Sequence, residues 1–124
     1  DCADNKDTLA EIRRCFTHDG YLLDPHTAVA SHVLRQYRIA THDDSPTVLL
    51  STANPYKFAS DVLRAITDEQ AVQGMDAFAC SEELERLTGM PMPKQVRELR
   101  DLPVRHTAVC ERDAMGPAVL EQFG

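Results

Sequence analysis

The stretch SPTVLLSTANPYKF, residues 45–58, carries the strongest indication of the fold. Residues 47–50 suit a short buried strand, and Asn54-Pro55 then has the composition of a helix start, with asparagine as N-cap and proline in the first turn. The strand shows no alternation of polar and apolar residues, which is typical of a strand in a parallel sheet covered on both faces. We therefore expect an α/β fold around this segment.

Two hydroxyl side chains, Ser51 and Thr52, directly follow the predicted strand. In open α/β sheets ligands bind beyond the carboxyl ends of the strands, where a hydroxyl can bond to a ring nitrogen without introducing a charge. The alternative is that Ser51 or Thr52 merely satisfies backbone groups at the turn. Lys57, in the first turn of the next helix, could reach an anionic substrate group or extend into solvent.

Capping residues and apolar spacing predict helices on both sides of this segment. The first, over residues 8–18, ends at a glycine, and another is expected to end at Gly89. A short helix is expected on Val96 and Leu99, and the last helix should turn its apolar side chains inward. The expected helix starts are Thr8 (capping-box spacing with Glu11), Asp24 followed by Pro25, Asn54, Thr67 (capping-box spacing with Gln70), Ser81 and Asp113. The inward residues of the last helix are Val119, Leu120 and Phe123.

A second strand is predicted over residues 104–110. Two short strands make a marginal sheet by themselves, and the first is apolar on both faces. We therefore expect the chain, residues 1–124, to be one mostly helical segment whose strands join a larger sheet formed by residues absent from it. The alternative is a self-contained helical domain with a small sheet.

Composition excludes several functions. With a net charge of −7 and scattered Lys and Arg, the 124-residue chain is not expected to bind nucleic acid. It has no apolar run long enough to span a membrane, and its acidic start is not a signal peptide, so we expect a cytoplasmic protein. The four cysteines, at positions 2, 15, 80 and 110, show no C-x-x-C spacing and are expected to be reduced. Neither they nor the histidines have the spacing of a metal site, and no complete catalytic motif is present.

Two segments together resemble threonine synthase. GYLLDPHTAVASHVL, residues 20–34, resembles the G-Y-x-x-D-P-H-T-A-V stretch of that family, and VLLSTANPYKF, residues 48–58, resembles its V-x-L-x-T-A-H-P-x-K-F stretch. The resemblance implies the C-terminal portion of a three-layer α/β enzyme of the tryptophan-synthase-β type. Such enzymes are pyridoxal-phosphate-dependent lyases of threonine biosynthesis, converting O-phosphohomoserine and water to threonine and phosphate.

The same resemblance implies roles for particular residues. By motif position Thr52 would face the pyridine nitrogen of the cofactor, with Ser51 as its neighbour. Asn54 stands where the family usually has histidine, and Asn54 and Lys57 are candidates for substrate contact. His26 and Thr27 of the D-P-H-T stretch are expected mainly to shape the start of a helix near the cleft.

The family's Schiff-base lysine and phosphate-binding glycine loop lie upstream, so the resemblance implies no catalytic residue in this chain and no activity of the chain alone. The implied partners are the upstream catalytic part of the same polypeptide and O-phosphohomoserine, with a homodimer possible. The alternative is a stand-alone, non-catalytic association domain derived from the same fold, or an unrelated helical binding module.

Overall fold

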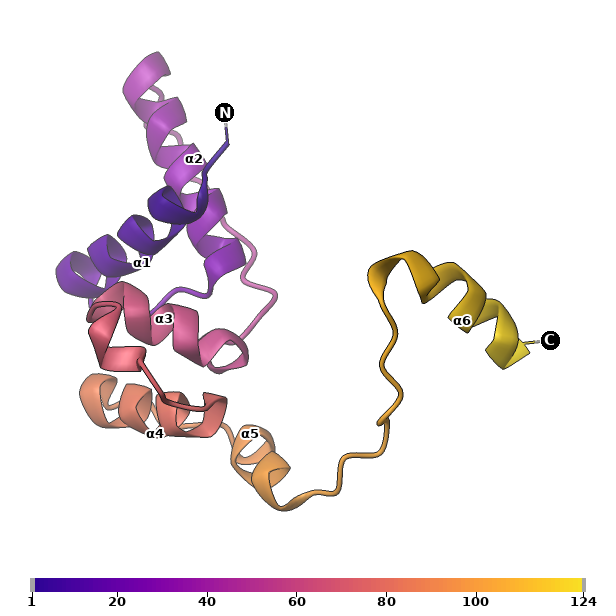
Figure 1. Cartoon of the computed structure of the whole chain (residues 1–124). Helices are drawn as coiled ribbons and strands as arrows, with labels where there is room; N and C mark the ends of the chain where they lie inside the picture. The colour runs from indigo at the N-terminus through magenta and orange to yellow at the C-terminus, as the bar shows by residue number, and fades with distance from the viewer. Residues whose placement is uncertain (1, 124) are drawn as a thin grey trace.

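The computed structural model describes residues 2–123, and within this range the secondary structure is helical, with no β-strand (Figure 1). The α-helices are α1 (Asn5–Asp19), α2 (Pro25–Thr41), α3 (Ala59–Ile66), α4 (Ala77–Thr88), α5 (Lys94–Glu98) and α6 (Met115–Phe123). The short 3-10 helices are η1 (Pro55–Phe58), η2 (Gln70–Val72), η3 (Leu99–Asp101) and η4 (Arg112–Ala114).

Helix α1 begins earlier than predicted. Its N-cap is Asp4, whose side chain accepts a hydrogen bond from the Asp7 backbone N–H in a reciprocal capping box, so the predicted start at Thr8 is wrong. The Thr8 hydroxyl instead donates to the Asp4 carbonyl inside the helix. The predicted end is confirmed, because Gly20 takes the left-handed conformation with φ of 66°.

The two Asx-Pro starts are confirmed. Asp24 caps α2 by accepting the backbone N–H groups of His26 and Thr27, and Asn54 accepts the N–H of Tyr56 at 3.0 Å. The second start opens as η1 and becomes the α-helix α3 only at residue 59.

The helices predicted from Thr67 and Ser81 need correction. Only η2 forms after Thr67. Helix α4 starts at residue 77 with Asp76 as its N-cap, and Ser81 lies buried within it, donating to the Ala77 carbonyl. Gly89, with φ of 67°, ends α4 as predicted, and α5 with η3 forms the short helix expected around Val96.

Helix α3 is at the centre of the core, since α1 and α4 both pack against it, while α2 packs against α1 (Figure 1). Val62 and Leu63 of α3 are fully buried in this core. The buried apolar residues of the core are Ile12, Cys15, Leu22, Leu23, Ala28, Tyr56, Ala59, Val62, Leu63, Ala65, Cys80, Leu84 and Met92.

The predicted strand at residues 47–50 is not formed. The segment runs as irregular backbone from α2 to η1, with Val48 86% exposed and Leu50 82% exposed. A strand requires backbone hydrogen bonds to a neighbouring strand, and no described segment of this chain provides them. The fold prediction of an α/β portion with two strands is therefore correct for its mostly helical character and not for its strands.

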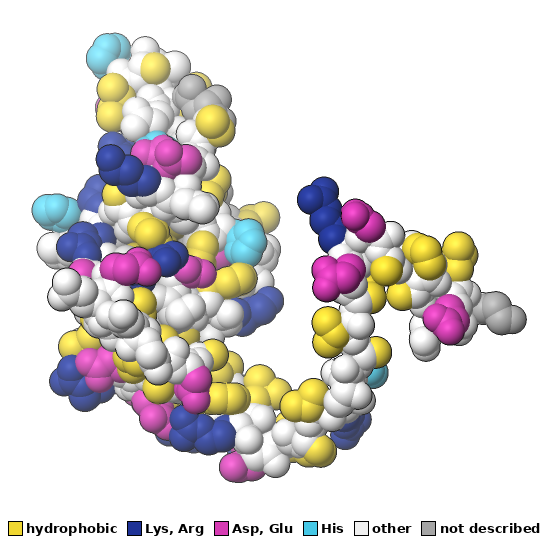
Figure 2. Space-filling model, viewed as in Figure 1, with side chains coloured by type: hydrophobic (Ala, Val, Ile, Leu, Met, Phe, Trp, Pro, Cys, Tyr) yellow, Lys and Arg dark blue, Asp and Glu magenta, His cyan; other side chains and the backbone are white. Residues whose placement is uncertain are grey.

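Residues 104–110, the second predicted strand, are also irregular and exposed. Figure 1 shows this segment running away from α5 and carrying α6 apart from the other helices, and Figure 2 shows hydrophobic side chains along both. The prediction that α6 packs inward is wrong. Val119, Leu120 and Phe123 are 56%, 73% and 88% exposed, because α6 packs against η4 and not against the core helices.

Candidate functional site

The N-terminus of α2 holds a buried carboxylate whose two oxygens have different partners. Asp24 is 1% exposed, and its Oδ1 accepts the backbone N–H groups of His26 at 2.9 Å and Thr27 at 3.2 Å. Its Oδ2 accepts the Thr27 hydroxyl and, at 3.3 Å, the hydroxyl of Ser51. The first oxygen therefore caps the helix, and the second binds a pair of hydroxyl groups.

The pKa of Asp24 lies below its ordinary value. Burial by itself would raise it, but the hydrogen bonds from the Thr27 side chain, the two backbone N–H groups and Ser51 favour the charged form and outweigh that effect. Asp24 is therefore a carboxylate at neutral pH, acting as an acceptor toward the hydroxyls around it.

Ser51 is the point at which the segment before η1 meets α2. Its Oγ lies 3.2 Å from Thr27 Oγ1 as well as 3.3 Å from Asp24 Oδ2. Earlier in the segment, Arg38 of α2 donates to the Ser45 carbonyl at 2.9 Å and lies 3.4 Å from Thr47 Oγ1. The segment is thus attached to α2 at both of its ends by hydrogen bonds that involve side chains.

Thr52 follows Ser51 directly in the segment. Leu49 is half-buried, and Val48, Leu50, Ser51 and Thr52 are exposed, although Ser51 bonds to α2. Within the part of the chain that the structure describes, the Thr52 hydroxyl has no hydrogen-bond partner, so it is free to bind a ligand.

His26 and Lys57, from the two resembling segments, both lie near the ring of Phe58. The His26 ring is 5.1 Å from that of Phe58, measured between centroids and tilted by 59°, and Lys57 Nζ is 5.9 Å from the Phe58 centroid. Lys57 is exposed. The structure therefore brings the two resembling segments, residues 20–34 and 48–58, together at two places, His26 with Phe58 and Asp24 with Ser51.

Asn54 has a structural contact that the sequence also predicted. Its Oδ1 accepts the Tyr56 N–H as the cap of η1, and the residue itself is exposed. Asparagine thus preserves the turn at the position where the resemblance expects histidine. The cap leaves the amide nitrogen of Asn54 available on the surface.

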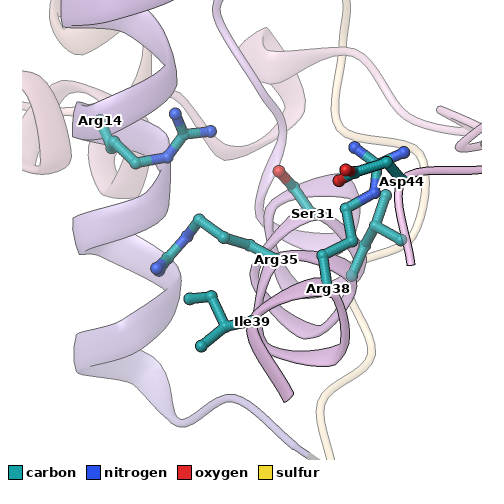
Figure 3. A pocket seen from close by; sticks show the side chains of 7 residues that line it. Arg14, Ser31, Arg35, Arg38, Ile39 and Asp44 are labelled. Atoms are coloured by element: carbon teal, nitrogen blue, oxygen red, sulfur yellow. The ribbon is translucent and has the colours of Figure 1, made fainter. Parts of the chain in front are cut away.

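A hollow of about 420 Å³ lies elsewhere, between α1 and α2. Figure 3 shows Arg14 and Arg35 reaching into it from the two helices. Both arginines pair with Glu11, at 2.9 and 3.2 Å, which is 1% exposed and also accepts the Ser31 hydroxyl at 2.8 Å. This arrangement ties the two helices together, and it contains none of the predicted site residues.

The sequence prediction missed two members of the candidate site and the role of one further residue. Asp24 and Thr27 were interpreted as residues that start a helix, whereas both bind Ser51. Glu11 was interpreted as a capping residue but is the buried carboxylate between α1 and α2. The sequence shows that Thr27 lies three residues after Asp24, within reach of its carboxylate. It gives no sign that Ser51, 27 residues further along, also bonds to Asp24.

Within residues 2–123 no group of three or more His, Cys, Asp and Glu side chains is arranged to hold a metal ion. None of the described helices combines the length and apolar character that crossing a bilayer requires.

Comparison with known proteins gives matches to one family. Residues 27–116 match the family described as "Threonine synthase, C-terminal". The chain is 38% identical to threonine synthase of Corynebacterium glutamicum over 73 residues, which are 59% of this chain and 14% of that protein. It is 40% identical to threonine synthase-like 1 of Homo sapiens over 58 residues, which are 47% of this chain and 7% of that protein. The chain thus matches a small part of the length of these relatives.

Proposed function

Because this chain belongs to the threonine synthase family, as a C-terminal portion, we propose that it is the C-terminal part of a cytoplasmic, pyridoxal-phosphate-dependent threonine synthase. The reaction is the conversion of O-phosphohomoserine and water to threonine and phosphate. The single observation that carries this proposal is the contact between the two family-like segments, in which Ser51 is bonded to Asp24 and Thr52 is exposed, without a hydrogen-bond partner among the described residues.

The chemistry of the Thr52 side chain suits one edge of a pyridine ring. Thr52 offers a neutral hydroxyl that can donate to a ring nitrogen or accept from it. The described residues include no glycine-rich phosphate cradle, so in this proposal the chain forms one wall of the cofactor site and the upstream part supplies the rest, including the lysine that binds the cofactor. When bound, pyridoxal phosphate supplies the electron sink for chemistry at the carbons next to the amino group.

Thr52 has one task in this proposal, to hold the ring nitrogen in place through Oγ1. A neutral hydroxyl stabilises a proton on that nitrogen less than a carboxylate would, because it brings no negative charge. Ser51, whose own hydroxyl is bonded to Asp24, is the neighbour that shapes this end of the segment.

Asn54 and Lys57 are the proposed substrate contacts. The exposed amide nitrogen of Asn54 can donate to an anionic oxygen while its Oδ1 still caps η1. The Lys57 ammonium is exposed and could pair with the phosphate or carboxylate of O-phosphohomoserine.

The upstream part of the same polypeptide is the proposed partner of the two exposed segments. Val48 and Leu50 in the first segment, and Val104 and Val109 in the second, are between 79% and 95% exposed. Apolar side chains of this exposure favour burial, at about 25 cal/mol per Å² of apolar surface removed from water. Addition of residues 47–50 and 104–110 as strands to the sheet of the upstream part would bury them and satisfy their backbone groups.

The decisive experiment replaces Thr52 in the full natural polypeptide. Thr52→Val removes the hydroxyl at nearly constant volume and is expected to weaken cofactor binding by roughly tenfold, the factor that corresponds to about 1.4 kcal/mol. Thr52→Ser is the matched control, and it should bind the cofactor nearly as well as wild type. Equal cofactor affinity and turnover in the valine variant would remove Thr52 from the site.

The intact mass of the natural polypeptide tests the partner. A mass several times the 13.8 kDa of this chain supports the proposed enzyme. A mass equal to it, with a dimer in solution, would contradict the proposal and favour an association domain whose exposed segments pair with a second copy.

A further inference from the structure

The hydroxyl network at the start of α2 assigns a task to a residue that the capping pattern of the sequence predicted only as an N-cap. We propose that Asp24 is a positioning residue for the cofactor-facing hydroxyl of Thr52, acting through its hydrogen bond to Ser51. This inference rests on the proposed function, since it concerns how the same site is held.

The first step is that the two oxygens of Asp24 have different hydrogen-bond partners. Capping α2 requires only Oδ1, which accepts the N–H groups of His26 and Thr27. Oδ2 is not needed for the cap, yet it is buried and receives the hydroxyls of Thr27 and Ser51. An N-cap that served the helix alone would not need a partner 27 residues further along the chain.

The second step concerns the proton of Ser51. A serine hydroxyl has one proton, and a carboxylate can only accept, so the bond to Asp24 directs the Ser51 proton toward α2. Ser51 can then offer only its oxygen lone pairs to a ligand. Thr52, exposed and without a partner among the described residues, is left as the hydroxyl that can donate outward from this end of the segment.

The third step is the adjacency of Ser51 and Thr52. Both side chains are exposed, and of the two only Ser51 has a hydrogen-bond partner among the described residues. Because the two residues share a peptide bond, the attachment of Ser51 to Asp24 limits the positions that the backbone of Thr52 can take. Loss of the attachment would spread the Thr52 hydroxyl over more positions.

Asp24→Asn separates positioning from capping. Asparagine is a good N-cap, so its Oδ1 keeps the two backbone bonds, whereas Nδ2 in place of Oδ2 is a donor, so the charged acceptor for the Thr27 and Ser51 protons is lost and the Ser51 proton is no longer directed toward α2. The experiment uses the full natural polypeptide as apoprotein, titrated with pyridoxal phosphate by absorbance to obtain the dissociation constant, with the unfolding temperature of each apoprotein measured in parallel.

We expect Asp24→Asn and Ser51→Ala each to weaken pyridoxal phosphate binding by roughly fivefold to tenfold. Because both act on the same link, the double variant should be no weaker than the weaker single variant by more than about twofold. Ser51→Thr, which keeps the hydroxyl, should restore binding. Asp76→Asn is the matched control, since Asp76 caps α4 through Ala79 and has no contact with residues 51 and 52.

The outcomes distinguish this inference from the proposed function. If Thr52→Val weakens binding while Asp24→Asn and Ser51→Ala lower only the unfolding temperature, Asp24 is a helix cap and the inference is overturned, with the function intact. If Ser51→Ala weakens binding and Thr52→Val does not, Ser51 contacts the cofactor directly and the positioning role is again overturned. If the wild-type protein binds no pyridoxal phosphate, both fail. Should Asp24→Asn not fold, the Ser51→Ala and Ser51→Thr pair still decides between these results.

Discussion

Ser51 Oγ lies 3.3 Å from Asp24 Oδ2, although 27 residues separate them in the chain. The bond joins the two segments by which the sequence resembles threonine synthase, and it does so at a carboxylate that is 1% exposed. Of the two neighbouring hydroxyls, that of Ser51 is attached to α2, and that of Thr52 has no hydrogen-bond partner within residues 2–123.

Asp24→Ala should destabilise the protein by about 3 kcal/mol. It removes the N-cap of α2, worth about 1 kcal/mol, and leaves the hydroxyl of buried Thr27 without its carboxylate partner, a loss of about 1–3 kcal/mol. Asp24→Asn should destabilise by about half as much, since it keeps the cap. Urea denaturation followed by far-UV circular dichroism measures both, and equal losses in the two variants would contradict the separate roles of Oδ1 and Oδ2.

Glu11→Gln should destabilise the protein by about 2 kcal/mol. The buried carboxylate pairs with Arg14 and Arg35 and accepts the Ser31 hydroxyl, so removing its charge weakens both ion pairs and leaves Arg14 with only the more distant Asp19, at 3.5 Å, among the described residues. Glu83→Gln is the control, because the Glu83–Arg86 pair lies on the surface of α4 and its loss should produce no measurable change. Similar unfolding midpoints for wild type and Glu11→Gln would show that the pair does not hold α1 to α2.

The free energy of unfolding should decrease as the pH is lowered, in part because of Asp24. Its folded-state pKa lies below the ordinary aspartate value of 3.8, so the folded state resists protonation more than the unfolded state does. This contribution is complete above the ordinary value and is lost as the pH falls through it toward the folded-state pKa. The free energy of unfolding, measured between pH 6 and pH 3, should therefore decline less steeply in Asp24→Asn than in wild type. Parallel declines would contradict a depressed pKa at Asp24.

The same substitution, leucine to alanine, should change the stability of this chain by very different amounts at Leu63 and at Leu50. Leu63→Ala opens a cavity in the fully buried centre of α3 and should lower stability by about 3 kcal/mol. Leu50→Ala, at a side chain that is 82% exposed, should change the stability of this chain by less than about 0.5 kcal/mol. In the full natural polypeptide Leu50→Ala should become clearly destabilising, and a neutral effect there too would contradict docking of residues 47–50.

Trypsin should cleave this chain after Arg105 within the exposed segment that precedes α6. Cleavage requires a locally accessible, unstructured backbone, and residues 104–110 have neither secondary structure nor burial. In the full natural polypeptide the same bond should be protected if the segment pairs with the upstream sheet. Mass spectrometry of timed digests gives both results, and equal cleavage rates would count against the pairing.

Much of the helical architecture could be predicted because its signals are local. Asp24-Pro25 and Asn54-Pro55 place a short polar acceptor next to a residue without an N–H, and Gly20 and Gly89 adopt the positive φ that ends a helix. Thr8 and Ser81 were misassigned as caps for a local reason too. A better acceptor precedes each of them: Asp4 caps α1 four residues before Thr8, and Asp76 caps α4 five residues before Ser81. The Thr8 and Ser81 hydroxyls instead donate to carbonyls four residues earlier in the chain.

What could not be predicted depends on partners distant in sequence. An apolar run such as residues 47–50 becomes a strand only where another strand satisfies its N–H and C=O groups, and the described chain supplies none. Glu11 and Asp24 are carboxylates of the kind that occur near helix starts. They are buried only because α1 packs on α2 and the residues before η1 also pack on α2.

Local signals placed the start of α2, the start of η1 and the end of α4, because capping depends on neighbouring residues. They also placed two hydroxyls together before a helix. That Ser51 bonds to Asp24 followed only from the packing, because a hydrogen bond across 27 residues exists only once the segment lies against the first turn of α2.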